Sequence, residues 1–202
     1  MQHLIVVCHP KRESFVQSIA KAYADALRMQ GHTVVVRDLY RARFDPALNE
    51  ADLAGADKGR VATPVRREQR YISEAGAIAF FFPLWWGYMP AMMKGYVDRV
   101  FSRGFAYDVG VDEMAPLLAG KKALVFTSSG APMAELRRSK QWQAMGIMLK
   151  NHFLALCGIE LLEHVHFASI APGISEQTFG KHLSQVRDAA DRYWGAYAVP
   201  AG

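Results

Sequence analysis

The stretch AIAFFFPLWWGYMPAMMKGYVDRVF, Ala77 to Phe101, decides the fold. It opens with a continuous apolar run, Ala77 to Pro83, and passes through a turn that holds two adjacent tryptophans. After Pro90 the apolar residues recur at the spacing of one helix face. A strand that is apolar at every position is buried on both faces, as in a parallel sheet wrapped by crossover helices. The stretch therefore predicts an α/β fold.

Other parts of the chain repeat this alternation of strand and helix. Strand-like apolar runs cover residues 3–9, 33–39, 122–128 and 159–167. Helical patterns are expected at 14–30, 64–75, 90–102, about 140–156 and 175 to about 196. We predict one domain over residues 1–202, with five parallel strands and helices on both faces of the sheet. Residues 41–60 and 104–118 show neither pattern and are expected to be long irregular loops.

Composition narrows the class of protein. A chain of 202 residues, about half of them apolar, is long enough for one covered sheet. Its longest apolar run is far shorter than the roughly 20 residues of a membrane-spanning helix, and a signal peptide is not recognisable, so we expect a cytoplasmic protein. Cys8 and Cys157 lie in apolar sequence, which predicts two buried thiols. The formal charge of +5 is scattered, which argues against nucleic acid as a partner and favours a small anionic ligand.

An open α/β sheet binds ligands where its strands end, so the strand ends are interpreted together. After the first strand, Ser14 is predicted to cap a helix while Gln17 reaches back in a capping box. The free backbone amides of Ser14 to Gln17 would then form a seat for an anion, with His9 at the strand tip. An ordinary capped helix is the alternative, because this stretch contains neither a Walker loop nor a dinucleotide fingerprint.

The third and fourth strands are followed by residues of different chemical character. Trp85 and Trp86 precede the helix, so they either pack against a neighbouring subunit or lie flat against a planar ligand. The fourth strand ends in TSSG, 127–130, whose small residues let backbone donors approach a ligand closely. An anion seat, an aromatic wall and close backbone donors together fit a phosphorylated planar cofactor.

Three motifs carry a resemblance to a known family: HPKRESF (9–15), FPLWWGYMPAMMKGYVDRVFSRGFAY (82–107) and TSSG (127–130). They resemble the flavodoxin-like NAD(P)H quinone oxidoreductases, which include ancillary subunits of bacterial potassium-efflux systems. The resemblance implies a five-stranded sheet in the order 2-1-3-4-5, a homodimer and bound FMN or FAD. It also implies hydride transfer from NAD(P)H to a quinone or similar flat acceptor in a ping-pong cycle. The alternative is a regulatory flavin- or nucleotide-binding subunit associated with a membrane transporter.

The resemblance also assigns cofactor-binding positions in this sequence. The first strand end would hold the flavin phosphate and ribityl chain, the third would line the isoalloxazine, and the fourth its pyrimidine edge. No catalytic acid or base is assigned, because the tyrosine and histidine that mammalian members place after the fourth strand are missing from APMAELRRSKQW. The assigned residues are His9, Ser14, Phe15, Val16 and Gln17; Pro83, Leu84, Trp85, Trp86 and Gly87; and Thr127, Ser128, Ser129 and Gly130.

Three further groups of residues are considered as possible site residues, and each also has an ordinary structural interpretation. His164 and His166 alternate on the fifth strand, but no third ligand is apparent, so no metal site is predicted. Tyr107 and Asp108 follow the long motif, where the resemblance implies reach toward the partner's flavin; ordinary loop positions are the alternative. The basic stretch ELRRSK, 135–140, is expected on a mobile loop, either as a solvated surface or as a clamp for the 2′-phosphate of NADPH.

Overall fold

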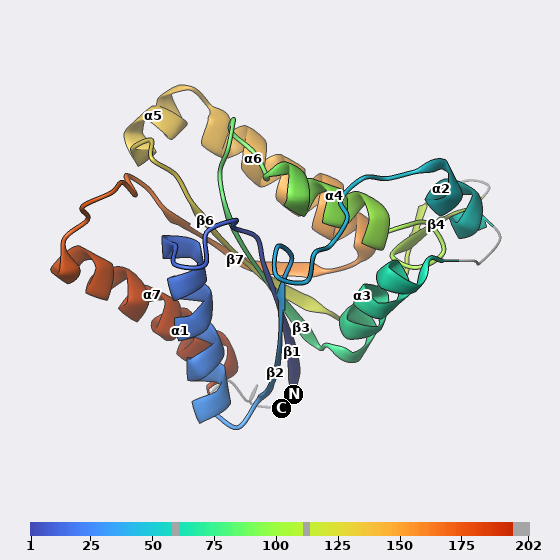
Figure 1. Ribbon diagram of the computed structural model, residues 1–202, viewed down its shortest axis with the longest axis horizontal. Coiled ribbons are helices and arrows are strands. Elements are labelled where there is room, and N and C mark those ends of the chain that lie inside the picture. Colours follow the sequence, from blue (N-terminus) through green and yellow to red (C-terminus); the bar gives the residue numbers. More distant parts are fainter. Residues whose placement is uncertain (58–60, 111–113, 196–202) are drawn as a thin grey trace.

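The computed structural model describes residues 1–57, 61–110 and 114–195. A central sheet of five parallel strands is covered by helices on both faces (Figure 1). Its strand order, β2-β1-β3-β6-β7, is the predicted order 2-1-3-4-5 counted along the main sheet. The strands are β1 (Gln2–Val7), β2 (Thr33–Asp38), β3 (Ala77–Pro83), β6 (Lys122–Ser128) and β7 (Glu160–Phe167).

The two faces of the sheet bury two separate apolar cores. Helices α1 (Phe15–Met29) and α7 (Glu176–Trp194) lie side by side on one face, as Figure 1 shows. Helices α3 (Thr63–Glu74), α4 (Ala91–Val100) and α6 (Gln141–Leu149) cover the other.

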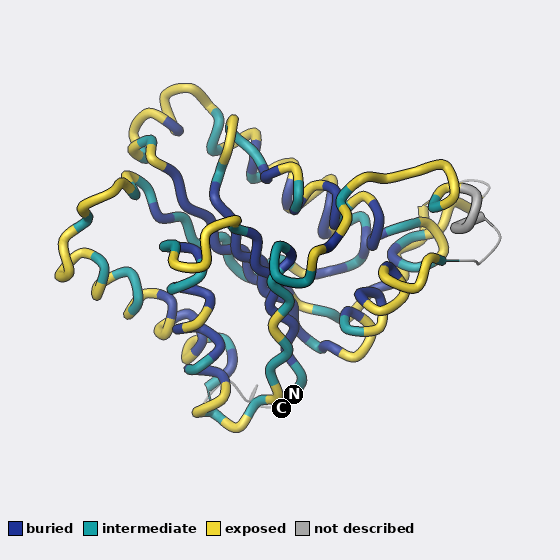
Figure 2. Tube along the Cα trace, viewed as in Figure 1, coloured by how far each residue is buried: buried dark blue, intermediate teal, exposed yellow. Residues whose placement is uncertain are grey.

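Alternation along β3 explains why this strand is apolar throughout. Phe81 points into the core under α1 and α7, whereas its neighbours Phe80 and Phe82 point into the opposite core. The three central strands are buried in this way along their length (Figure 2). The two edge strands, β2 and β7, are only partly buried, so burial on both faces does not extend to them. This exposure is the physical reason that β7 tolerates Glu163, His164 and His166.

The two segments predicted to be irregular contain regular structure, so that prediction was wrong. Segment 41–60 holds α2 (Glu50–Asp57), and 104–118 holds the antiparallel pair β4 (Tyr107–Val109) and β5 (Met114–Pro116). Helix α2 is anchored by Asp52, which accepts from Arg99 Nε of α4 at 2.8 Å. Such a long-range ion pair leaves no periodic signal. Residues 58–60 and 111–113 of these segments lie outside the described residues.

The helix predicted at about 140–156 is divided. It consists of α6, a π-helical turn η1 (Lys150–Leu154) and a 3₁₀ turn η2 (Ala155–Cys157), and a further short helix, α5 (Met133–Arg138), precedes it. The last helix ends at Trp194, where Gly195 is extended, so it stops within two residues of the predicted end near residue 196.

Both thiols are free and buried, as predicted. Within the described ranges, none of the helices has the length and apolar character needed to cross a bilayer. The same ranges contain no cluster of three or more histidine, cysteine or acidic side chains arranged to hold a metal ion.

Candidate functional site

A cleft of about 650 Å³ lies at the carboxyl ends of β1, β3, β6 and β7. Its size is that of a small-molecule site. Most of the predicted binding residues line it: His9, Ser14, Phe15, Val16, Pro83, Leu84, Trp85, Ser128, Ser129 and Gly130. The other four, Gln17, Trp86, Gly87 and Thr127, do not.

The loop between β1 and α1 presents unpaired backbone donors to the cleft. Ser14 has an extended conformation and its Oγ accepts from the Gln17 N–H at 3.2 Å, so Ser14 is the predicted N-cap. The N–H groups of Phe15 and Val16 have no acceptor among the described residues. Free amides at the positive end of a helix are suited to bind an anion, and Phe15 and Val16 both line this end of the cleft.

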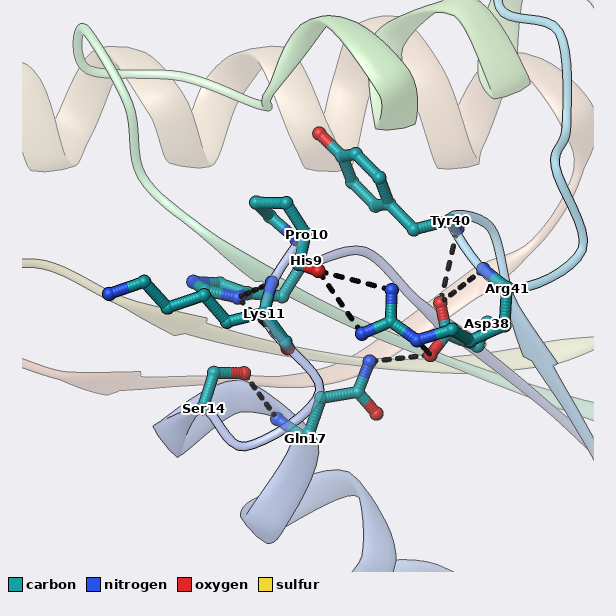
Figure 3. A network of polar contacts seen from close by, with 8 residues as sticks. All are labelled: His9, Pro10, Lys11, Ser14, Gln17, Asp38, Tyr40 and Arg41. Atoms are coloured by element: carbon teal, nitrogen blue, oxygen red, sulfur yellow. Dashed lines mark hydrogen bonds and ion pairs between the residues drawn. The ribbon is translucent and has the colours of Figure 1, made fainter.

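The capping box is only half formed. The Gln17 side chain does not return to Ser14; its Nε2 donates instead to Asp38 Oδ2 at the end of β2, at 2.7 Å (Figure 3). The charge-assisted bond that Nε2 donates to the carboxylate orients the Gln17 side chain toward β2. Gln17 therefore ties helix α1 to the neighbouring strand rather than facing the cleft.

The same loop is held from the β2 side by Arg41. Its Nη1 and Nη2 both donate to Pro10 O at 3.1 Å, and its Nε lies 3.8 Å from Asp38 Oδ2. Asp38 Oδ1 accepts from the backbone N–H groups of Tyr40 and Arg41, so one carboxylate organises both segments (Figure 3). The loop conformation is thus fixed by the protein before any ligand binds.

His9 is held as a neutral donor beside this seat. Its Nδ1 accepts from the Lys11 N–H at 3.1 Å, which leaves the ring proton on Nε2. Burial, the largest cause, lowers the pKa of His9 below its ordinary value; a hydrogen bond with the Lys11 backbone opposes this shift, while the cations Lys11 and Arg41 add to it. In this tautomer the imidazole offers the cleft a hydrogen-bond donor at Nε2.

The two tryptophans have different positions. Trp85 and Tyr88 exchange backbone hydrogen bonds of 3.0 and 3.1 Å, which close a two-residue turn at Trp86 and Gly87. Both turn residues have positive φ, 53° and 83°, as a type I′ turn requires. Trp85 lines the cleft with its ring 5.9 Å from that of His9, whereas Trp86 is fully exposed and stands away from it. A bulky residue at positive φ carries strain of about 1–2 kcal/mol, which points to a role for the exposed indole.

The end of β6 contributes a second set of donors. Ser129 N–H donates to Phe167 O at 3.0 Å and Ser129 O accepts from Ile170 N–H at 2.8 Å, which joins this loop to the one after β7. The next two N–H groups, of Gly130 and Ala131, have no acceptor in the described part of the chain. Gly130 lines the cleft, while Thr127 lies fully buried beneath it.

A comparison with known families matches residues 1–190 to a family described as flavodoxin-like fold. The chain belongs to this flavodoxin-like family. A Haemophilus influenzae relative named "Uncharacterized NAD(P)H oxidoreductase" is 34% identical over 171 residues, which cover 84% of this chain and 85% of the relative.

Two further relatives of the flavodoxin-like chain carry more specific names. "NAD(P)H dehydrogenase [quinone] 1" of Cavia porcellus is 30% identical over 180 residues, 79% of this chain and 66% of that protein, so the chain spans about two thirds of its length. The solved "NAD(P)H:quinone oxidoreductase from Methanothermobacter marburgensis" superimposes with a TM-score of 0.83 at 28% identity, covering 94% of this chain and 95% of that one.

The flavodoxin-like cleft also includes residues that the sequence argument missed. They come mainly from the loop after β7 and the start of α7, with three more beside the β1 loop. The rule that ligands bind where the strands end could also have been applied to the fifth strand. It would then have predicted that the stretch ASIAPGIS, 168–175, lines the site. The additional residues are Lys11, Glu13, Ser18, Ile170, Ala171, Pro172, Gly173, Ile174, Glu176 and Phe179.

The remaining predicted positions lie outside the cleft of the flavodoxin-like protein. Arg137 and Arg138 are exposed, as predicted, but they belong to helix α5 rather than to a mobile loop, because the helix begins directly after Pro132. Tyr107 and Asp108 lie on β4, and Tyr107 lines a separate cavity of about 330 Å³.

Proposed function

We propose that this flavodoxin-like protein is a flavin-dependent NAD(P)H:quinone oxidoreductase. One observation carries the proposal: a single cleft combines unpaired amides at the start of α1, the Trp85 indole, and the unpaired Gly130 amide. The names of the relatives, NAD(P)H oxidoreductase and quinone dehydrogenase, support the same activity. When bound, a flavin would supply two-electron hydride chemistry between a nicotinamide and a quinone.

The residues present fit the parts of a flavin mononucleotide. Phe15 and Val16 N–H groups, with His9 and Lys11 beside them, suit the phosphate. The Trp85 ring offers a flat apolar wall, and Gly130 offers a backbone donor without a side chain in the way. These residues would orient the ring, and the Gly130 donor would stabilise negative charge at its polar edge.

We propose FMN as the resident cofactor. Ile174 and Phe179 also line the cleft, beyond the residues assigned to FMN, which gives a specific reason to consider FAD, whose adenosine would need additional apolar contacts. Mass spectrometry of the ligand released from the purified protein separates the two.

We propose that the protein acts as a homodimer in the cytoplasm. Trp86, Val109, Met114 and Met148 are large apolar side chains that this chain alone leaves exposed. A second copy would cover them, since apolar patches on soluble proteins commonly mark an interface.

The test is reconstitution of the apo-protein with FMN or FAD, followed by NAD(P)H oxidation with a panel of quinones. Parallel double-reciprocal lines are expected, because the two substrates would use one cleft in turn in a ping-pong cycle. Flavin binding without turnover would favour a regulatory subunit, and transporter pull-down would then test the membrane association. A protein that binds neither flavin overturns the proposal.

A further inference from the structure

A partly buried series of hydrogen bonds joins β7 to the loop after β6. Thr127 Oγ1 lies 2.7 Å from His164 Nε2 and 2.8 Å from His166 Nδ1. Ser129 Oγ lies 3.0 Å from His166 Nε2 and 2.8 Å from the carbonyl oxygen of Ala131. The chain therefore runs from His164 through Thr127, His166 and Ser129 to Ala131.

The register of β7 against β6 makes this chain possible. An irregularity between Ala123 and Leu124 shifts the pairing by one residue, so that Thr127 lies opposite His166. Without the shift, the pairing of Lys122 with Glu160 would continue and place Val165 opposite Thr127. A one-residue slip turns every side chain of a strand to its other face. The irregularity therefore brings both imidazoles to the side of Thr127.

The carbonyl oxygen of Ala131, at one end of this series of hydrogen bonds, determines which atom donates in each bond. A carbonyl oxygen only accepts, so the Ser129 hydroxyl donates to Ala131 O and accepts from His166 Nε2–H. His166 Nδ1 is then an acceptor for the Thr127 hydroxyl, which itself accepts from His164 Nε2–H. All bonds are satisfied together when both imidazoles are neutral and carry the proton on Nε2.

The surroundings favour these neutral forms. Burial lowers the pKa of His166 to about 4 and that of His164 to about 3, with repulsion from His166 contributing to the latter. The Trp142 ring of α6 stacks on His164 at 4.7 Å and lies 5.3 Å from His166. Neither imidazole is therefore suited to hold a proton as a cation at neutral pH.

We propose that His166 is a positioning residue, which acts through Ser129 to aim the free N–H group of Gly130 at the cleft that Gly130 lines. The N–H, the carbonyl and the hydroxyl of Ser129 all form hydrogen bonds, which fix its position. The backbone of the two residues that follow, Gly130 and Ala131, is constrained as a result. The Ser129 hydroxyl also binds the far end of this short turn, at Ala131 O. The inference rests on the proposed function in one respect: the group that the Gly130 donor would meet is the flavin.

The first test needs no flavin. Nitrogen-15 NMR of histidine side chains in the apo-protein is expected to show His164 and His166 as neutral Nε2–H tautomers that do not titrate between about pH 8 and about pH 5.5. Assignment uses His164→Gln and His166→Gln. An Nδ1–H tautomer or a cation at His166 in this range overturns the proposal, whether or not the protein proves to be a flavoenzyme.

The second test separates positioning from packing. His166→Gln places an amide donor near the position of Nε2 and keeps the bond to Ser129, whereas His166→Asn reaches only to the position of Nδ1. Flavin affinity, from fluorescence titration of the apo-protein, is expected to fall about tenfold in His166→Asn and Ser129→Ala and to be largely restored in His166→Gln.

A matched control is Ser73→Ala, an exposed serine on α3. Its flavin affinity is expected to equal that of the wild type. Circular dichroism confirms folding of every variant. Equal losses in the asparagine and glutamine variants, or no loss in either, would show that His166 merely fills space. A wild-type protein that binds no flavin defeats the proposed function, while the NMR result still decides the state of His166.

Discussion

Ser14 offers a test in which stability and ligand binding move in opposite directions. Its hydroxyl caps α1 at a position where the unpaired N–H groups of Phe15 and Val16 form the anion seat. Ser14→Ala removes the cap, whereas Ser14→Asp keeps a capping oxygen and adds a negative charge. The two variants therefore separate the helix from the ligand.

The expected magnitudes follow from the cap and from Coulomb's law. Loss of the cap in Ser14→Ala destabilises the apo-protein by about 1 kcal/mol, or a fall of about 2–4 °C in Tm. Ser14→Asp leaves Tm unchanged or slightly higher, because aspartate caps as well as serine and suits the helix dipole. A unit charge about 4 Å from a phosphate costs about 1 kcal/mol in water and about 4 kcal/mol near a protein surface. The Kd for FMN should therefore rise between about fivefold and about a thousandfold.

The assay is fluorescence titration of FMN and of riboflavin into each apo-protein at several salt concentrations. Riboflavin lacks the phosphate, so its affinity should be the same for Ser14→Asp as for the wild type. Ser73→Asp is the control for the added charge, because Ser73 is exposed on α3 and does not line the cleft. Wild-type affinity of Ser14→Asp for FMN, or an equal loss for riboflavin, would refute the anion seat.

Four further outcomes are expected. Trp85→Ala should weaken flavin binding by about 1–3 kcal/mol and more than Trp86→Ala, since only Trp85 lines the cleft; equal titration curves would contradict this. If the exposed cations of α5 bind the 2′-phosphate, Arg137→Ala and Arg138→Ala, singly and together, should lower kcat/KM with NADPH by roughly one to two decades and leave kcat/KM with NADH unchanged. Equal losses with the two nucleotides would show that these arginines belong to the solvated surface. Sedimentation at micromolar concentration should show a flavin-loaded dimer, and a monomer would disprove the interface. Burial lowers the pKa of His3 to about 4, so the unfolded chain binds the extra proton below about pH 6.5; the loss of stability in urea unfolding between pH 7.5 and pH 5, to which His164 and His166 also contribute, should be about 2 kcal/mol smaller in His3→Leu than in the wild type, and an equal loss in the two proteins would contradict this.

Sequence patterns predicted the parts of this protein that depend on neighbouring residues. The apolar run of β3 and the helical spacing of α4 are local signals, and both elements were found where expected. Ser14 was predicted as a cap because its partner is only three residues away. Since parallel strands end at one edge of a sheet, the positions of His9, Trp85 and Gly130 at a common cleft followed from the same patterns.

Tertiary structure alone decided which partners distant side chains choose. Gln17 bonds to Asp38 across two elements, and Arg99 anchors α2 through Asp52; neither pair has a sequence spacing that could reveal it. The contrast between Trp85 in the cleft and exposed Trp86 arises from positive φ in a turn closed by Tyr88.

The clearest case is the chain from His164 to Ser129. The alternation of the two histidines was visible in the sequence, but their common partner, Thr127, was not. The pairing depends on a one-residue irregularity between two strands, and strand register is set by how whole faces of the sheet pack. The sequence by itself therefore determined the elements and the edge at which they meet, while the register between strands decided the hydrogen bonds made there.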